Sequence, residues 1–271
     1  MSQPRFEASP ASDKARAQSP YWGEHVARYR FAAPQLTKRS VLDIACGTGY
    51  GMPVLQASAR SVVGVDIDWE AVRKTQAEIA ALGNGRTLVM LADGCRLPFA
   101  DASFDAVTSF ETLEHLENRP QFLAELRRVL SPQGVCILST PNAHYTQPIN
   151  GKPRNPYHVY EYTPTELRAE LAAHFEVSAM FGQMLDARFT IPPFWDAQQR
   201  LPRTPGVQAQ LLAWRALNKL PVSLREGTSR AVWGRPFYPA DTDYRFDATT
   251  VETAPVVVAI CRARERAGES R

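Results

Sequence analysis

Long hydrophobic runs, paired cysteines and a strong net charge are all missing from this sequence. No stretch approaches the ~18 uninterrupted apolar residues that a membrane-spanning helix needs. The four cysteines are scattered at Cys46, Cys95, Cys136 and Cys261 without a C-x-x-C pair, which predicts reduced core thiols in a cytoplasmic protein. A net charge of +3 over 271 residues gives no whole-chain case for nucleic acid as a partner.

The N-terminal residues also lack the pattern of a signal peptide. Residues 1–19 are polar and rich in Pro, Ser and Ala, so we expect a disordered lead there and a flexible tail at 264–271. With 44% hydrophobic residues, the remaining chain can bury one large core. These features favour a single soluble enzyme domain.

A glycine loop follows the first strand-like run. Residues 41–51 read V-L-D-I-A-C-G-T-G-Y-G, so an apolar run leads directly into Gly47, Gly49 and Gly51. Glycine is needed where the backbone takes a positive φ or lies against a ligand, and a strand-to-helix turn is a common place for a nucleotide cofactor. The G-x-G-x-G spacing differs from the G-x-G-x-x-G of dinucleotide-binding folds.

Further apolar runs predict a parallel α/β sheet. Residues 61–68, S-V-V-G-V-D-I-D, place Asp66 at the C-terminal edge of a second buried strand, one βαβ unit after Asp43. Thr163 and Glu166 have capping-box spacing, and Pro34 is expected to stop the first helix. We expect further strands at 86–92, 104–110, 134–140, 176–181 and 255–261, and helices at 21–33, 69–82, 119–130, 164–175 and 207–220.

Together these motifs resemble the class I S-adenosylmethionine-dependent methyltransferases over roughly residues 20–185 and the last strand. The resemblance implies an α/β, Rossmann-like sheet of seven strands with the last one antiparallel, and an N-terminal helix that closes over the cofactor. Asp66 would accept the ribose hydroxyls and Asp93 would face the adenine amine. The implied S-adenosylmethionine-binding residues are Tyr21, Arg28, Asp43, Ala45, Gly47, Gly49, Asp66, Ile67, Asp93, Gly94 and Phe110.

The first helix has two interpretations. Tyr21, His25 or Arg28 could reach the methionine carboxylate of the cofactor, or the helix could be a packed surface element with Arg28 in solvent. The sequence leaves both open.

Residues 186–250 interrupt the family pattern. We interpret them as a helical insertion between strands six and seven that caps the acceptor side, within a methyltransferase domain formed by 20–185 and 251–263. Residues 190–236 contain seven arginines and lysines against two acids. This excess of positive charge could bind an anionic or lipid-linked acceptor or an acidic membrane surface. It is equally consistent with an ordinary helical face in contact with solvent.

Two carboxylates and an imidazole follow the fourth strand. Glu111, Glu114 and His115 stand at i, i+3 and i+4, which would put them on one face of a helical turn at the carboxyl edge of the sheet. Such a set suits Mg²⁺ or Mn²⁺ and, less exclusively, Zn²⁺ or Fe²⁺. His158, within N-P-Y-H-V-Y-E-Y-T, is the candidate fourth ligand.

The pattern E-x-x-E-H, then T-P-N and a later histidine, resembles small-RNA 2′-O-methyltransferases and ubiquinone-pathway O-methyltransferases. The overall likeness is strongest to bacterial sugar and polysaccharide O-methyltransferases, which share the A-C-G-T-G-Y-G, S-T-P-N and N-P-Y-H-V segments. That resemblance implies O-methylation of a sugar, glycan or other diol-bearing small molecule. Glu111, Glu114, His115 and His158 would hold the metal, with His115, Glu111 and His158 acting at the acceptor hydroxyl.

Other readings stay open. His115 could be a general base without metal in an N- or C-methyltransferase of a small metabolite, or the cluster could be structural. An RNA enzyme should carry an RNA-binding appendage, which is not recognisable here, and a non-catalytic S-adenosylmethionine-binding protein would not need the polar cluster. His144 and Tyr145 are candidates for contacting the acceptor, whereas we expect His25 and His174 to have structural roles. The sequence leaves open whether the protein forms a homodimer.

Overall fold

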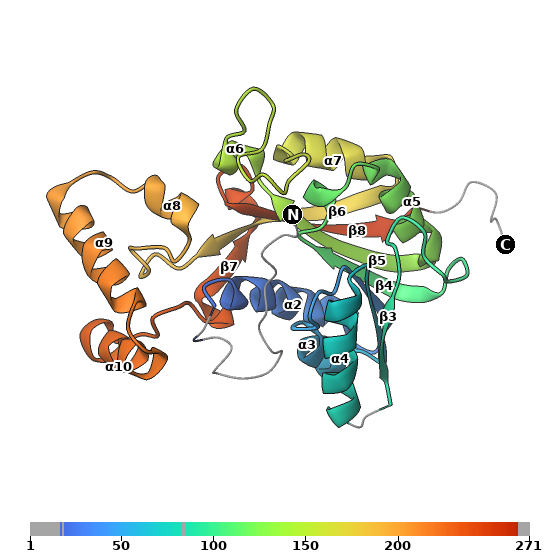
Figure 1. The fold of residues 1–271 in the computed structure, drawn as a ribbon. Coiled ribbons are helices and arrows are strands. Elements are labelled where there is room, and N and C mark those ends of the chain that lie inside the picture. Colours follow the sequence, from blue (N-terminus) through green and yellow to red (C-terminus); the bar gives the residue numbers. More distant parts are fainter. Residues whose placement is uncertain (1–16, 18, 83–84, 265–271) are drawn as a thin grey trace.

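The computed structural model describes residues 17, 19–82 and 85–264, and its centre is one mixed eight-stranded sheet (Figure 1). The strand order is β3-β2-β1-β4-β5-β8-β6-β7. β1 to β5 are parallel, and β8 runs antiparallel between β5 and β6. The strands are β1 (Ser40–Ile44), β2 (Ser61–Asp66), β3 (Thr87–Leu91), β4 (Phe104–Phe110), β5 (Leu130–Pro141), β6 (Phe175–Leu185), β7 (Tyr244–Asp247) and β8 (Val256–Ala263).

Helices cover both faces of the sheet and give it two hydrophobic cores. Three helices, α2 (Trp22–Leu36), α3 (Met52–Ser58) and α4 (Trp69–Leu82), lie on one face, where Tyr29, Leu55 and Val72 enter one core. α5 (Arg119–Val129) and α7 (Pro164–Ala172) lie on the other face, with Leu126 and Leu171 in the second core. Figure 1 shows the two groups on opposite sides of the strands. This layering leaves the carboxyl edge of β1, β2 and β4 open to loops.

The seventh strand of the expected sheet is confirmed as the antiparallel β8, but the expected count of seven strands is wrong. Tyr244–Asp247 forms β7, which pairs antiparallel with the end of β6 from Gly182 to Leu185. The last part of the segment expected to be an insertion therefore extends the sheet by a short edge strand.

The rest of that segment forms a separate helical unit. It contains α8 (Trp195–Gln199), α9 (Pro205–Asn218) and α10 (Val222–Trp233), and Figure 1 shows α9 and α10 projecting beyond the β7 end of the sheet. A small core of its own holds it together, formed by Ile191, Leu211, Trp214, Phe237 and Tyr238. Short elements complete the fold: α6 (Ala143–Thr146) and the 3₁₀ turns η1 (Leu113–His115), η2 (Asp241–Asp243) and η3 (Ala248–Thr250).

Two helix boundaries differ from expectation. Pro34 lies inside α2 because a proline in the last turn removes a single backbone hydrogen bond, and the helix ends only at Leu36. α7 ends at Ala172, since Phe175 already begins β6. The capping box at Thr163 and Glu166 is confirmed.

The cysteines and the termini complete the comparison. All four cysteines are free, and three of them are buried, as expected. Among the described helices, none has the length and apolar character to cross a bilayer. The expected lead at 1–19 and tail at 264–271 lie almost entirely outside the described residues.

A candidate donor and acceptor site at the carboxyl edge of the sheet

The glycine loop turns sharply between β1 and α3. Ala45, Gly47 and Gly49 all have left-handed backbone conformations, with φ of 58°, 55° and 73°. Gly51 is required for a different reason, because a Cβ there would lie 2.2 Å from the Tyr29 ring of α2. The loop is thereby held against α2, and Gly47 N faces the end of β2.

Asp66 ties this loop to the second strand. Its Oδ2 accepts a hydrogen bond from Gly47 N at 2.8 Å, and its Oδ1 accepts one from Asp68 N at 2.9 Å. The next residue, Ile67, is 71% exposed although apolar, which leaves its side chain free to pack on a flat ligand. An acid with an apolar neighbour at a strand end suits a ribose and a base.

The loop after β3 adds a second acid beside a close-packed glycine. Asp93 is exposed, and its Oδ1 accepts from Cys95 N at 2.8 Å. Gly94 packs against Phe122 of α5, where a Cβ would approach to 2.7 Å. The sequence-predicted residues of β1, β2 and β3 thus meet along one edge.

Asp43 does not face this edge. It is fully buried, with Tyr29 Oη donating to Oδ2 at 2.9 Å and Thr108 Oγ1 donating to Oδ1 at 2.7 Å. Burial raises the pKa of Asp43 to about 7. Both carboxylate oxygens are used to join α2, β1 and β4, so Asp43 positions the loop rather than presenting itself to a cofactor.

Arg28 of α2 is fully buried above the loop, which rules out the solvated surface helix. Its Nε donates to Gln183 Oε1 at 2.7 Å, and its Nη1 lies 2.8 Å from His25 Nδ1. Burial and the Arg28 charge lower the pKa of His25, so this ring is neutral and accepts. Arg28 Nη2 is buried and has no hydrogen-bond partner, although Glu111 Oε2 lies 3.6 Å away.

The aromatic neighbours of Arg28 complete this wall of the site. Phe110 is buried at the end of β4, edge-on to Tyr29 at 4.8 Å. Tyr21 is half exposed and lies 5.1 Å from the Phe194 ring of the segment leading to the helical unit. Tyr21 therefore lies where α2 approaches the segment that leads to the helical unit.

Glu111 is separated from Glu114 and His115, contrary to the prediction of one helical face. The chain takes a left-handed turn at Glu111, with φ 52°, and only Leu113–His115 forms a 3₁₀ turn. Glu111 Oε1 accepts from Ser139 Oγ at 2.7 Å, and its other oxygen faces Arg28. Glu111 thus belongs to the Arg28 side of the site.

Glu114, His115 and His158 do come together. One potential ligand atom from each lies within 4.8 Å of the others, which makes them a candidate three-residue metal site among the described residues. Glu114 is 1% exposed; Thr140 Oγ1 donates to its Oε2 at 2.9 Å, while its Oε1 is buried without a hydrogen-bond partner. Burial, and secondarily Glu111, raises the pKa of Glu114.

Hydrogen bonds fix the orientation of both histidines. His115 Nδ1 lies 2.9 Å from Tyr157 O, so this nitrogen carries the proton and Nε2 is left toward Glu114, 3.8 Å from its Oε1. Burial lowers the pKa of His115, which keeps the ring neutral. The two imidazole rings meet edge to face at 4.8 Å.

Glu161 is a site residue that sequence reasoning missed. Its Oε1 accepts from His158 Nδ1 at 2.6 Å, and Thr146 Oγ1 donates to its Oε2. The pKa of Glu161 is lowered because these hydrogen bonds outweigh burial. The H-x-x-E spacing of His158 and Glu161 was the available signal, since a carboxylate behind a histidine is the usual support for a ligand or base.

The remaining histidine and tyrosine candidates lie apart from this cluster. His144 is half exposed and lies 3.0 Å from Glu252. Tyr145 lies under the Arg200 guanidinium at 4.4 Å, and Arg200 Nη2 donates to Thr146 O at 3.0 Å. The helical unit therefore touches the loop that carries Thr146, and His174 lies elsewhere, at the end of α7.

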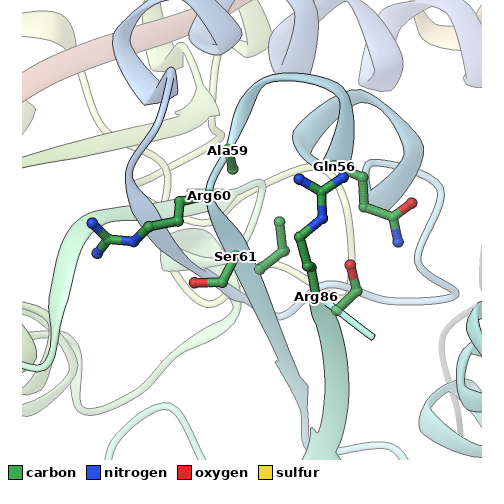
Figure 2. Close-up of a pocket in the computed structure, with 7 residues that line it drawn as sticks. Gln56, Ala59, Arg60, Ser61 and Arg86 are labelled. Carbon is green, nitrogen blue, oxygen red and sulfur yellow. The ribbon is translucent and has the colours of Figure 1, made fainter. Parts of the chain in front are cut away.

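A pocket shown in Figure 2 is not part of this site. It is lined by Arg60, Ser61 and Arg86 at the amino-terminal ends of β2 and β3. Parallel sheets place their chemistry at the opposite edge. The candidate site is accordingly assigned from the glycine loop and the strand ends.

Comparisons with known proteins give a consistent match. Residues 42–138 match the family profile described as a methyltransferase domain. A probable S-adenosylmethionine-dependent methyltransferase of Mycobacterium tuberculosis is 38% identical over 164 residues, which cover 60% of this chain and 58% of the relative. The 27-O-demethylrifamycin SV methyltransferase of Amycolatopsis mediterranei is 32% identical over 131 residues, covering 44% and 48%.

Solved structures share the fold. The MccD protein superposes with a TM-score of 0.57 at 19% identity, covering 91% of this chain and 100% of that one. The [4+2]-cyclase SpnF gives 0.56 at 19% identity, covering 89% and 82%. The chain spans less than two thirds of the length of the Mycobacterium tuberculosis relative, and at these structural identities only the fold is comparable.

Proposed function

We propose that this chain is a class I S-adenosylmethionine-dependent methyltransferase and that it methylates a hydroxyl oxygen of a sugar, glycan or other diol-bearing small molecule, supported by its match to a methyltransferase domain and its likeness to the Mycobacterium tuberculosis relative. A divalent metal held by Glu114, His115 and His158 would assist it. The proposal joins two halves of one site, a donor half around the glycine loop and an acceptor half around the histidines.

Arg28 supports the donor half. Arg28 is fully buried, and its Nη2 makes no hydrogen bond although Glu111 Oε2 lies 3.6 Å and Glu24 Oε2 3.8 Å away. The remaining donor capacity of this Nη2 suits the methionine carboxylate of the cofactor. Asp66, Ile67 and Asp93 lie along the edge of the sheet where the ribose and adenine would bind, and Asp66 Oδ1 and Oδ2 also accept hydrogen bonds from Asp68 N and Gly47 N. We therefore keep these residues in the donor site and assign Asp43 a positioning role.

The observation that carries the acceptor half is the buried Glu114 Oε1 without a hydrogen-bond partner, 3.8 Å from His115 Nε2. Leaving a buried carboxylate oxygen unpaired is costly, and a cation between it and the two imidazoles would satisfy it. Two imidazoles and one carboxylate suit Mn²⁺, Fe²⁺ or Zn²⁺ better than Mg²⁺, which prefers oxygen ligands. The residue types therefore fit such an ion, and Asn155 Nδ2, which lies 2.8 Å from His158 Nε2, would have to move for that nitrogen to bind it.

In methyl transfer, the acceptor oxygen attacks the sulfonium methyl in line, the C–S bond breaks as the C–O bond forms, and the hydroxyl proton must leave. A divalent ion, when bound, makes a coordinated hydroxyl easier to deprotonate. His115 keeps Nε2 directed into the site because Tyr157 O holds its Nδ1, and Glu161 holds the His158 ring. Arg28 and the glycine loop align the donor.

A second reading follows from the same geometry. The neutral His115, whose Nε2 lies at the site 3.8 Å from Glu114 Oε1, could accept the acceptor proton without any ion, in an N-, O- or C-methyltransferase of a small metabolite. Calorimetry distinguishes this from the metal-assisted reaction.

The test is calorimetric titration of S-adenosylhomocysteine, followed by a diol-bearing nucleotide sugar with and without Mn²⁺ or Mg²⁺. Wild type, His158→Ala and Glu114→Gln are compared with His174→Ala as a matched histidine control. We expect all four proteins to bind S-adenosylhomocysteine. We expect metal-dependent binding of the sugar in wild type and His174→Ala only.

Two results would contradict the proposal at different levels. If S-adenosylhomocysteine binds tightly but neither the metal nor His158→Ala affects sugar binding, the metal-assisted mechanism is wrong and His115 is the candidate base. No S-adenosylhomocysteine binding in any folded variant would overturn the donor site itself.

A further inference from the structure

The helical unit of α8, α9 and α10 exposes four large apolar side chains. Leu212 is 66% exposed, Leu220 39%, Leu224 58% and Val232 65%. The inner side of α9 is buried, since Leu211 and Trp214 fill the unit's own core, and Trp233 of α10 packs against the same core. The exposed residues are therefore a second apolar surface and not an incomplete core.

These side chains form two short helical stripes. Leu212, Ala216 and Leu220 follow one another at intervals of four along α9 and its end, and Leu224 and Val232 are eight apart along α10. Residues spaced by four lie on one side of a helix. Each helix is thus amphipathic with an outward apolar side.

Positive charge accompanies the apolar residues. No acidic residue occurs from 197 to 225, whereas Arg203, Arg215 and Lys219 in this range are exposed. On α9, Arg215 and Lys219 are three and seven residues after Leu212 and hence on its side of the helix. Basic and apolar side chains are interleaved in one place.

We propose that α9 and α10 dock onto an anionic lipid bilayer surface, with Leu212, Leu220, Leu224 and Val232 entering the interface and Arg203, Arg215 and Lys219 meeting the headgroups. Interleaved basic and apolar side chains on helices that lie in the interface plane are the pattern that binds such surfaces. Figure 1 shows α9 and α10 at the outer end of the molecule, away from the β3 edge. This docking is independent of methyl transfer.

Residues 1–16 are a poor match as an alternative cover for this surface. Their sequence offers only Met1 and Phe6 as large apolar side chains, and three basic residues outnumber Glu7 and Asp13, so this segment carries no acidic excess to meet the basic residues of α9. A second copy of the chain would have to bring two basic surfaces together. An anionic bilayer supplies both negatively charged headgroups for the basic residues and an apolar interior for the exposed leucines and valine.

The test is co-sedimentation of the full chain with vesicles of phosphatidylglycerol and phosphatidylcholine, against vesicles of phosphatidylcholine alone. Leu212→Ser/Leu224→Ser removes apolar contact, and we expect at least roughly tenfold weaker binding. Arg215→Gln/Lys219→Gln removes two charges, and we expect binding about 25-fold weaker, at about fivefold per charge. The matched controls are Leu88→Ser/Leu91→Ser on β3 and Arg73→Gln/Lys74→Gln on α4, whose native residues are also exposed.

Circular dichroism melting shows which variants are folded, and only folded ones are compared. The proposal stands if wild type and both controls bind the anionic vesicles while both α9–α10 variants bind more weakly. It is overturned if anionic and neutral vesicles retain the protein equally, or if the controls weaken binding as much. A concentration-dependent dimer in light scattering that Leu212→Ser/Leu224→Ser dissociates, without vesicle binding, would instead assign the surface to a second copy.

Discussion

Asp43 and Asp105 lie in the same sheet, but their pKa values are shifted in opposite directions. Asp43 is buried between Tyr29 and Thr108, and burial raises its pKa to about 7. Asp105 lies at the surface, and the hydrogen bond from Ser40 N, with smaller contributions from Ser40 Oγ and Arg60, lowers its pKa. Each should affect stability over a different pH range.

We expect Asp43→Asn to change how stability depends on pH. Because the folded-state pKa of Asp43 exceeds its unfolded value, the native state binds the extra proton between about pH 4 and 7, and wild type loses stability as pH rises through that range. The variant lacks this loss. Its unfolding free energy should gain roughly 2–4 kcal/mol relative to wild type between about pH 4 and pH 8.

Urea unfolding at several pH values measures this change. Asp105→Asn serves as the control of opposite sign, because a lowered pKa stabilises the folded protein above the unfolded pKa and this gain is lost on acidification. A constant difference between Asp43→Asn and wild type across the pH range would show that Asp43 is not protonated in the fold.

Glu161 gives a second prediction for a single residue. Glu161→Gln keeps the size of the side chain but weakens the hydrogen bond to His158 Nδ1. If His158 is a metal ligand, we expect Mn²⁺ affinity to fall by about 10- to 100-fold, the usual effect of losing such a support. Electron paramagnetic resonance of free Mn²⁺ gives the affinity, and Glu117→Gln, at an exposed position, is the control. Unchanged Mn²⁺ binding in Glu161→Gln would show that Glu161 does not support a metal ligand.

Two helical glycines illustrate how contacts decide the effect of the same substitution. A Cβ at Gly23 of α2 would meet Pro239 O at 2.3 Å, whereas at Gly227 of α10 there is no atom within 4 Å. We expect Gly23→Ala to destabilise the protein by about 1–3 kcal/mol through overpacking. Gly227→Ala should stabilise it by about 0.5–1 kcal/mol through helix propensity.

Thermal and urea unfolding of both variants tests this pair. Equal effects would mean that α2 is not packed against the 239–240 backbone as described. The comparison also measures how firmly α2, which carries Arg28, is held against the segment before β7.

Local pattern predicts the central elements well and the connections poorly. The runs at β1, β2 and β4 are β-branched and continuous, so their strands could be placed from sequence. β7 was missed because Y-R-F-D is short and mixed, and its pairing with β6 comes from a distant segment. Glu111 was misplaced because its left-handed turn depends on Ser139 and Arg28, which no local spacing encodes.

The helical unit and the sheet have separate cores in one molecule, so their stabilities should be separable. Trp214 is buried in the unit, stacked on Phe237 at 4.9 Å. We expect Trp214→Ala to cost about 3–5 kcal/mol within the unit and to speed amide exchange in α9 and α10. The amides of β4, β5 and β8 should keep their protection.

Hydrogen exchange followed by mass spectrometry resolves these segments. Leu126→Ala, in the core beneath α5, is the control and should speed exchange across the sheet. Loss of protection throughout the sheet in Trp214→Ala would show that the two cores unfold as one.

The position of β8 has a consequence for synthesis on the ribosome. This strand lies between β5 and β6, although it comes last of the eight along the chain. While residues up to about 250 leave the exit tunnel, β5 and β6 have no partner on their facing edges, and both are open to pairing with other nascent chains. The sheet can close only when residue 263 has emerged, so β5 and β6 remain exposed to wrong pairing until that point.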